Sequence, residues 1–279
     1  TIPNSVKSIG NSAFYGCSNL PDITLPSGIT TIERETFYNC SNLTSIIIPN
    51  RVANIGSAAF SGCKSLATIT IPGNVRSISD AVFSGCSNLK NINIDDLATW
   101  CGVIGLGNLM GGEKHLFVSG KEVKDLIIPN SVTSIEPSAF DGCIGLTSVT
   151  IGTGLQQVPE NTFKDCTNVK KLVYAEGCTN AFRTYLTGIS SATIPASVTS
   201  VEDKVFANCG DLSSIVVDAS NSVYDSRNKC NAIIKKSNNT LVCGCKSTVI
   251  PNNVTRIGNN AFYGCGGLKT ISIPNSVVM

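Results

Sequence analysis

The chain is poor in charged residues, histidine and tryptophan. Asp, Glu, Lys and Arg make up 14% of its 279 residues, against about 25% in an average globular domain. The formal net charge is only +2. This balance excludes the basic surface that proteins use to bind nucleic acid or an anionic membrane.

The residues that support catalysis are also scarce. The single His115 leaves one candidate general base for a nucleophile–base pair, and the acidic residues show no metal-loop spacing. The Gly-rich stretch 102–112 fits neither a dinucleotide fingerprint nor a P-loop, and Cys243-Gly-Cys245 is not a zinc-type C-x-x-C. No run approaches the ~20 apolar residues of a membrane span. We therefore expect no enzyme, no cofactor, no metal and no membrane span.

What the chain does contain is a 23-residue repeat. Its markers are a proline, a phenylalanine eleven residues later and a cysteine three residues after that. They recur at Pro3, Pro26, Pro49 and Pro72, at Phe14, Phe37, Phe60 and Phe83, at Cys17, Cys40, Cys63 and Cys86, and again at Pro129–Phe140–Cys143, Gly152–Phe163–Cys166, Pro195–Phe206–Cys209 and Pro251–Phe262–Cys265. A fixed period of this length predicts a solenoid in which each coil packs on its neighbours.

The pattern within one repeat predicts its local structure. Ile46-Ile47-Ile48 alternates between inward and outward positions, so we expect a short strand that Pro49 ends. A second extended piece is expected at 52–55. Residues 59–63, from Ala to Cys, suggest one helical or 3₁₀ turn, and Asn42 and Gly62 are expected at tight corners.

The thirteen cysteines do not indicate a disulfide framework. Eight of them share one repeat position, where parallel Cβ directions in adjacent coils disfavour bridging. We expect these eight to fill a buried column as small hydrophobic side chains. The others are Cys101, Cys178, Cys230, Cys243 and Cys245, and a bridge from Cys230 to Cys243 or Cys245 remains open.

Three inserts interrupt the period, at about 95–125, 175–193 and 218–249. The first holds Trp100 and His115 and ends in an expected hairpin at Ser119-Gly120; either it contacts a ligand, or Trp100 and Leu97 plug the core. In the second we expect Phe182, Tyr185 and Leu186 to replace the usual core residues. The third predicts a hairpin whose tip, 235–239, carries two lysines.

The unit from Leu66 to Cys86 reads Leu-x-x-Ile-x-Ile-Pro-x-x-Val-x-x-Ile-x-x-x-Val-Phe-x-x-Cys. This unit resembles the BspA-like leucine-rich repeat, and the resemblance covers essentially the whole chain. It implies a right-handed coil, mostly β, with short parallel strands and short helical or 3₁₀ turns. Such proteins are typically displayed on the surface of, or secreted by, host-associated anaerobic bacteria, and are implicated in adhesion. Both ends fall within a repeat, so we expect residues 1–279 to be one solenoid cut from a longer array, its signal peptide outside this segment.

The expected binding surface is the row of outward side chains on the parallel strands. It consists of Thr24, Ile47, Thr70, Asn93, Ile127, Thr150, Val173, Thr193, Val216 and Ser272. The expected partner is a protein, with a host extracellular-matrix protein as the candidate, bound by a monomer at the cell surface or after secretion. The alternative is a passive stalk that presents another domain of a longer surface protein.

Overall fold

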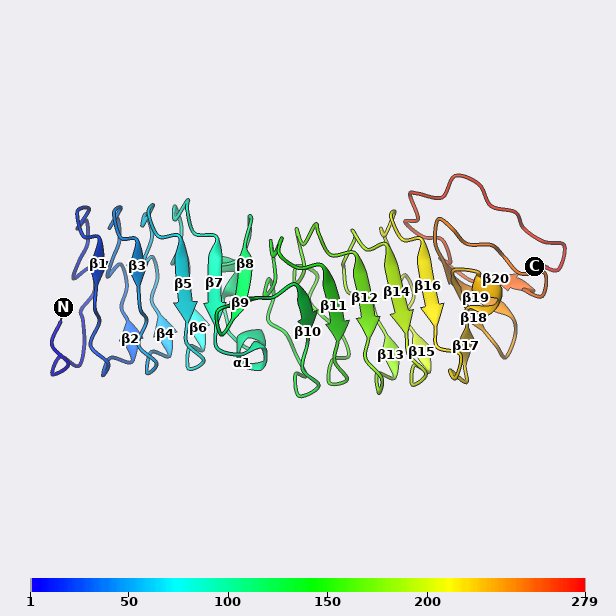
Figure 1. Cartoon of the computed structure of the whole chain (residues 1–279), viewed down its shortest axis with the longest axis horizontal. Helices are drawn as coiled ribbons and strands as arrows, with labels where there is room; N and C mark the ends of the chain where they lie inside the picture. Colours follow the sequence, from blue (N-terminus) through cyan, green and yellow to red (C-terminus); the bar gives the residue numbers. More distant parts are fainter. Residues whose placement is uncertain (1, 279) are drawn as a thin grey trace. The chain divides into compact units, whose positions relative to one another are not determined.

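The computed structural model describes residues 2–278, and their contacts divide the chain into two compact units. Unit 1 comprises Thr1–Val123 and Ile135–Gly145, and unit 2 comprises Lys124–Ser134 and Leu146–Met279. Each unit is a β-solenoid of short, mostly parallel strands with very little helix, as the 23-residue period predicts (Figure 1). The fold class expected from the sequence is confirmed.

Unit 1 contains three sheets, and apart from the β8–β9 hairpin their neighbouring strands come from successive coils. One sheet pairs β1 (Asp22–Ile23) with β3 (Ser45–Ile46), and a second contains β2 (Thr31–Ile32), β4 (Asn54–Ile55) and β6 (Ser77–Ile78). The third runs β5 (Thr68–Ile71), β7 (Asn91–Ile94), β8 (His115–Val118) and β9 (Lys121–Glu122), of which only the β8–β9 pair is antiparallel. The helix α1 (Leu97–Cys101) and the 3₁₀ turn η1 (Leu106–Asn108) lie between β7 and β8.

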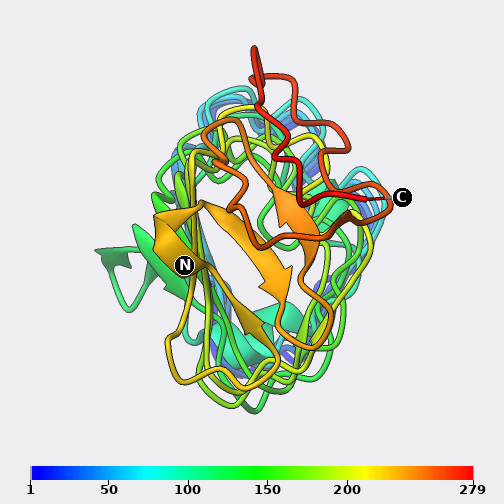
Figure 2. The same ribbon diagram turned by 90° about the vertical axis from the view of Figure 1, so that its right-hand side faces the viewer.

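Unit 2 is built around a five-stranded parallel sheet. Its order is β10 (Asp125–Ile127), β11 (Ser148–Ile151), β12 (Lys171–Tyr174), β14 (Ser191–Ile194) and β16 (Ser214–Val217), with β13 (Asn180–Ala181) and β15 (Ser200–Val201) paired elsewhere in the same coils. A mixed sheet follows, made of β17 (Tyr224–Asp225), β18 (Ala232–Lys235), β19 (Thr240–Gly244) and β20 (Arg256–Ile257), with η2 (Arg227–Lys229) before β18. Figure 2 shows this part of unit 2 facing the viewer.

The strands bury alternate side chains, as the period of two requires. In β5, Ile69 and Ile71 are buried, whereas Thr70 is exposed and Thr68 is half-buried. Each buried isoleucine contributes about 1.5–3 kcal/mol relative to an exposed one, so a column of them holds the coils together. Where a Pro follows the strand it turns the chain, and the Val52 amide donates to the Pro49 carbonyl at 3.0 Å.

The turn between the two extended pieces of a coil is not helical, which corrects the expectation for residues 59–63. Ala58 and Gly62 have φ of 55° and 77°, and two left-handed residues four apart cannot belong to one right-handed helical turn. Consecutive β-turns form instead. The amides of Ala58, Phe60 and Gly62 donate to carbonyls of the next coil at 2.7–3.0 Å, which adds a third ladder. The expectation for Asn42 was wrong, because the left-handed corner falls at Asn39.

The aromatic and cysteine columns follow from this stacking. The rings of Phe14, Phe37, Phe60 and Phe83 stack with centroid separations of 5.3, 5.4 and 5.5 Å. The described cysteines form no disulfide, and the Cys230 bridge left open by the sequence is not formed. Among the eight column cysteines, Cys17 is exposed and Cys265 half-buried, so the buried column includes six of the eight.

The first insert completes a coil of unit 1. The Trp100 ring is buried, and its Nε1 donates to the Ala139 carbonyl at 2.8 Å, so it plugs the core, while Leu97 is half-buried. The expected hairpin forms between β8 and β9, with positive φ at Ser119 and Gly120.

The other two inserts lie in unit 2. Phe182 and Leu186 enter its core as expected. Tyr185 does not; it is half-buried, and this expectation was wrong. The hairpin predicted at the third insert is confirmed as the antiparallel pair β18–β19.

Candidate protein-binding surface

The outward row of unit 2 is continuous across five strands. Register pairs join Ile127 to Thr150, Thr150 to Val173, Val173 to Thr193 and Thr193 to Val216. The inward neighbours Leu126, Val149, Leu172, Ala192 and Ile215 are buried and fix the strands that carry this row. Because parallel strands lie ~4.8 Å apart, the row presents one side chain per strand at a regular spacing.

The row in unit 1 is shorter and includes a residue that the sequence analysis missed. Ile47 bridges to Thr70, Thr70 pairs with Asn93, and Asn93 pairs with Phe117 of β8. Phe117 belongs to this row because the first insert returns a strand to the sheet. The alternation of His115, Leu116 and Phe117 was the available signal.

Two other residues of the expected row, Thr24 and Ser272, lie outside the strands. Thr24 follows β1 directly and is exposed. Ser272 was expected in the row, but this expectation was wrong. It lies in a stretch without strand, because after the third insert the chain does not form another strand there.

The row mixes hydroxyl groups with exposed aliphatic side chains. Ile127 is 61% exposed, Val216 49% and Ile47 81%, whereas Thr150, Val173 and Thr193 are half-buried. Exposed aliphatic groups in line on a rigid sheet form a surface on which a partner can bury apolar area.

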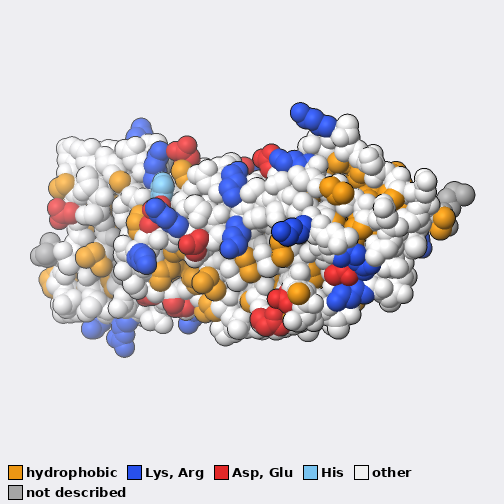
Figure 3. Space-filling model, turned by 45° about the vertical axis from the view of Figure 1, so that its right-hand side comes forward, with side chains coloured by type: hydrophobic (Ala, Val, Ile, Leu, Met, Phe, Trp, Pro, Cys, Tyr) orange, Lys and Arg blue, Asp and Glu red, His pale blue; other side chains and the backbone are white. Residues whose placement is uncertain are grey.

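The second outward row of unit 2 is polar. It contains Asp125, Ser148, Lys171, Ser191 and Ser214, joined by the same register pairs. The Ser148 hydroxyl donates to Asp125 Oδ1 at 2.5 Å, so one of the two charged groups is already engaged. Figure 3 shows charged side chains scattered over a mostly neutral surface.

The one histidine of the sequence is engaged in a structural contact. The ring Nδ1 of His115 lies 2.5 Å from Glu122 Oε1, which ties β8 to β9. Within the described residues no three His, Cys, Asp or Glu side chains form a group that could hold a metal ion. No helix among residues 2–278 has the length and apolar character needed to cross a membrane.

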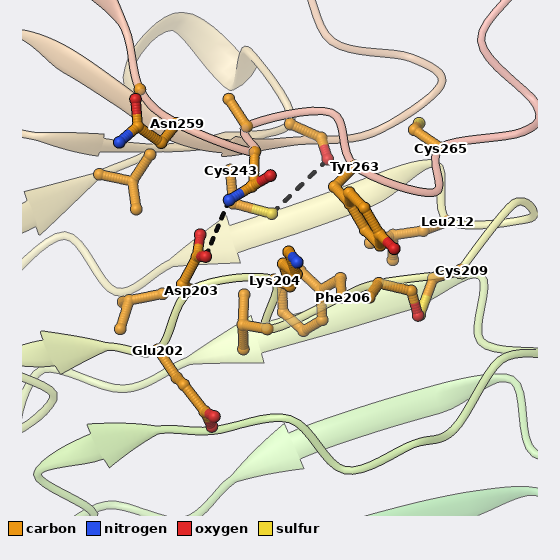
Figure 4. Close-up of a pocket in the computed structure, with 18 of the residues that line it drawn as sticks. Glu202, Asp203, Lys204, Phe206, Cys209, Leu212, Cys243, Asn259, Tyr263 and Cys265 are labelled. Atoms are coloured by element: carbon orange, nitrogen blue, oxygen red, sulfur yellow. Dashed lines mark hydrogen bonds between the residues drawn. The ribbon is translucent and has the colours of Figure 1, made fainter.

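A cavity of about 190 Å³ lies inside unit 2 between residues 201–212 and 240–265 (Figure 4). At one side Asn260 Nδ2 donates to Asp203 Oδ2 at 2.8 Å, and at another the Lys204 ammonium lies 4.4 Å from the centre of the Tyr263 ring. Cys209 and Cys243 line it, and burial raises the pKa of both thiols, that of Cys209 to about 12. Thiols held in the neutral form are poor nucleophiles and poor metal ligands, so the cavity carries no reactive group of this kind.

The repeats match a known family model. The model of the BspA type leucine-rich repeat region matches six copies, over residues 1–101, 113–232 and 234–279. The chain belongs to the BspA-type leucine-rich repeat family. Between the first two matched segments, residues 102–112 of this leucine-rich repeat protein hold η1, which explains why the repeat pattern is lost there.

Solved structures give further likenesses to this BspA-type chain. A leucine-rich repeat protein from Bacteroides ovatus is 28% identical, with 99% of this chain and 73% of that chain covered and a TM-score of 0.48. A leucine rich cell surface protein from Faecalibacterium prausnitzii is 25% identical, with 93% and 65% covered and a TM-score of 0.39.

A leucine-rich repeat protein of T. pallidum is 20% identical, with 69% and 78% covered and a TM-score of 0.32. All three TM-scores lie below 0.5, so the family match carries the assignment. A search of the curated proteins found no match.

Proposed function

We propose that this chain is a non-enzymatic protein-binding module of a cell-surface or secreted bacterial protein, and that it adheres to host proteins. The observation that carries the proposal is the register-aligned row of unit 2, which ends in the exposed Ile127 and Val216. The partner is a protein segment that packs apolar side chains on this row and hydrogen bonds to its hydroxyl groups. The surface location and the host partner rest on membership of the BspA-type family.

The strand face suits a protein partner better than a small ligand. It is a flat set of side chains fixed by buried neighbours, so little conformational entropy is lost when a partner binds. Its area extends over five adjacent strands, whereas small-molecule sites are concave. The chain binds as a monomer in this proposal, because each unit presents its own row.

The test is binding of the purified chain to immobilised fibronectin and fibrinogen over a salt series. Thr150→Glu with Thr193→Glu places two desolvated charges in the middle of the row and should weaken saturable binding at least tenfold. Ser200→Glu, at an exposed position on β15 of the same unit, is the matched control and should bind like the parent. A folded parent that binds neither protein would instead favour the passive stalk.

A further inference from the structure

A groove opens in unit 2 where the second insert shortens a coil. Leu186 follows Phe163 by 23 residues and takes the place of the next repeat phenylalanine, since Cys209 Sγ donates to its carbonyl at 3.1 Å. Regular coils show the same contact, as between Cys63 Sγ and the Phe37 carbonyl at 3.2 Å. The shortened coil therefore keeps the phenylalanine position but has no cysteine turn after it.

The missing turn leaves an open space of about 480 Å³. β14 begins five residues after Leu186, whereas β12 begins eight residues after Phe163, so three residues are absent from this corner. The volume lies within the roughly 300–1,000 Å³ of small-molecule sites. Residues 160–170, 183–188, Asn208 and Asp211 contribute to the lining.

Two backbone amides at the edge of the groove have no partner in the described residues of the next coil. In a regular coil the amides of Ala58 and Gly62 donate to carbonyls of the next coil at 3.0 and 2.7 Å. Among the described residues, the equivalent amides of Asn161 and Asp165 make no such backbone bond, and both residues line the groove. Two backbone donors are thus available at its edge.

An aromatic ring is fixed in the wall of the groove by a strained backbone. Tyr185 has φ of 61°, a left-handed conformation that is unusual for a bulky side chain. The Arg183 guanidinium lies 4.4 Å from the centre of its ring, and the Arg183 amide donates to Glu202 Oε2 at 2.8 Å. The buried Arg183 Nε has no hydrogen-bond partner. A buried donor without a partner can be satisfied by a ligand bound in the groove.

The charges that line the groove cancel. Lys164, Lys170 and Arg183 face three carboxylates, those of Glu160, Asp165 and Asp211. Lys170 is already engaged, because its Nζ donates to the carbonyls of Thr167 at 3.1 Å and Gly188 at 3.3 Å. Asp211 is engaged as well, because the Lys246 ammonium lies 3.7 Å from its Oδ1. The lining has no net formal charge, and the ligand that fits is neutral and rich in groups that both donate and accept.

We propose that this groove binds a neutral saccharide, such as one hexose unit of a glycan. The apolar C–H face of the sugar packs on the Tyr185 ring, and its hydroxyl groups accept from the Asn161 and Asp165 amides and donate to the carboxylates. The space is confined to one corner between neighbouring coils, which suits a single ring better than an extended peptide. This site lies at the turns of unit 2, apart from the strand-face row, so the two proposals can fail independently.

The test uses saturation-transfer NMR of the folded chain with the methyl glycosides of mannose, galactose, glucose and N-acetylglucosamine at millimolar concentration. At least one should show saturable transfer to its ring C–H protons. Tyr185→Gly removes the ring and suits the positive φ, so this variant should fold at least as stably as the parent yet bind at least tenfold more weakly. Tyr185→Phe should bind like the parent.

Tyr15→Ala, which removes an exposed tyrosine of unit 1, is the matched control and should leave the transfer unchanged. The proposal is overturned if none of the four glycosides shows saturable transfer, or if Tyr185→Gly binds as well as the parent. Displacement of the sugar by inorganic phosphate at equal concentration would also overturn it, because the groove would then be an anion site.

Discussion

At the scale of single residues, the buried cysteines act as small side chains that also donate a hydrogen bond between coils. The thiols of Cys40, Cys63 and Cys86 lie 3.0–3.2 Å from the phenylalanine carbonyl of the preceding coil. An alanine in this column would fill less space and donate nothing, and a serine would bring a more strongly hydrated group into an apolar site. The repeat therefore favours a thiol at this position.

The same burial makes stability depend on alkaline pH. Burial raises the pKa of Cys40 from 9.0 to about 11, and those of Cys101 and Cys209 to about 12. The unfolded chain loses these protons from about pH 9, while the folded chain keeps them, so their contribution is complete below pH 9 and is lost as pH rises to 11–12. We expect the urea midpoint to fall steeply over this range.

The control for this pH dependence is a comparison of two cysteine variants. Cys209→Ala removes one buried thiol and should make the fall in urea midpoint above pH 9 shallower. Cys17→Ala replaces an exposed thiol and should reproduce the slope of the parent. Equal slopes in both variants would show that burial of the thiols does not cause the alkaline loss of stability.

At the scale of elements, the strands could be predicted from the sequence and the corners could not. Alternation in Thr68–Ile71 and the proline after it determine the strand, its buried face and its end. The corner at Ala58 has a left-handed backbone without glycine, because three ladder bonds to the next coil compensate for its strain, and no local signal reports that. The stretch from Ala59 to Cys63 therefore resembled a helical turn.

Glycine has a structural role in the first insert, where Gly105 precedes η1 with φ of 82°. A Cβ placed there would lie 2.0 Å from the Ile78 carbonyl oxygen, against backbone that cannot move away without breaking β6. Gly105→Ala should lower the free energy of unfolding by about 1–3 kcal/mol or more. Gly10→Ala, with no atom within 4 Å of the added Cβ, should change it by less than about 0.5 kcal/mol, as measured by urea denaturation.

At the scale of the whole molecule, the repeat determines the architecture, and the departures from it determine the candidate sites. The period predicts the strand-face row because register follows from equal coil lengths. It does not predict Phe117 or the lack of strand at Ser272, since both depend on where an insert returns the chain. The groove beside Tyr185 was equally hidden, because a deletion of three residues creates space only when the neighbouring coils are in place.

Because a solenoid coil contacts only its neighbours, damage to one coil of unit 1 should stay local. Phe60 is fully buried between two stacked rings, so Phe60→Ala should destabilise its coil by about 3–5 kcal/mol. Amide exchange should then quicken by about 100-fold or more in β4 and β6 but little in β8, two coils away. Phe14→Ala, at a half-buried ring with one stacked neighbour, should have a much smaller effect. If Phe60→Ala instead exposed β4 and β8 equally, unit 1 would unfold as one cooperative body, and stacking would not be a sum of neighbouring contacts.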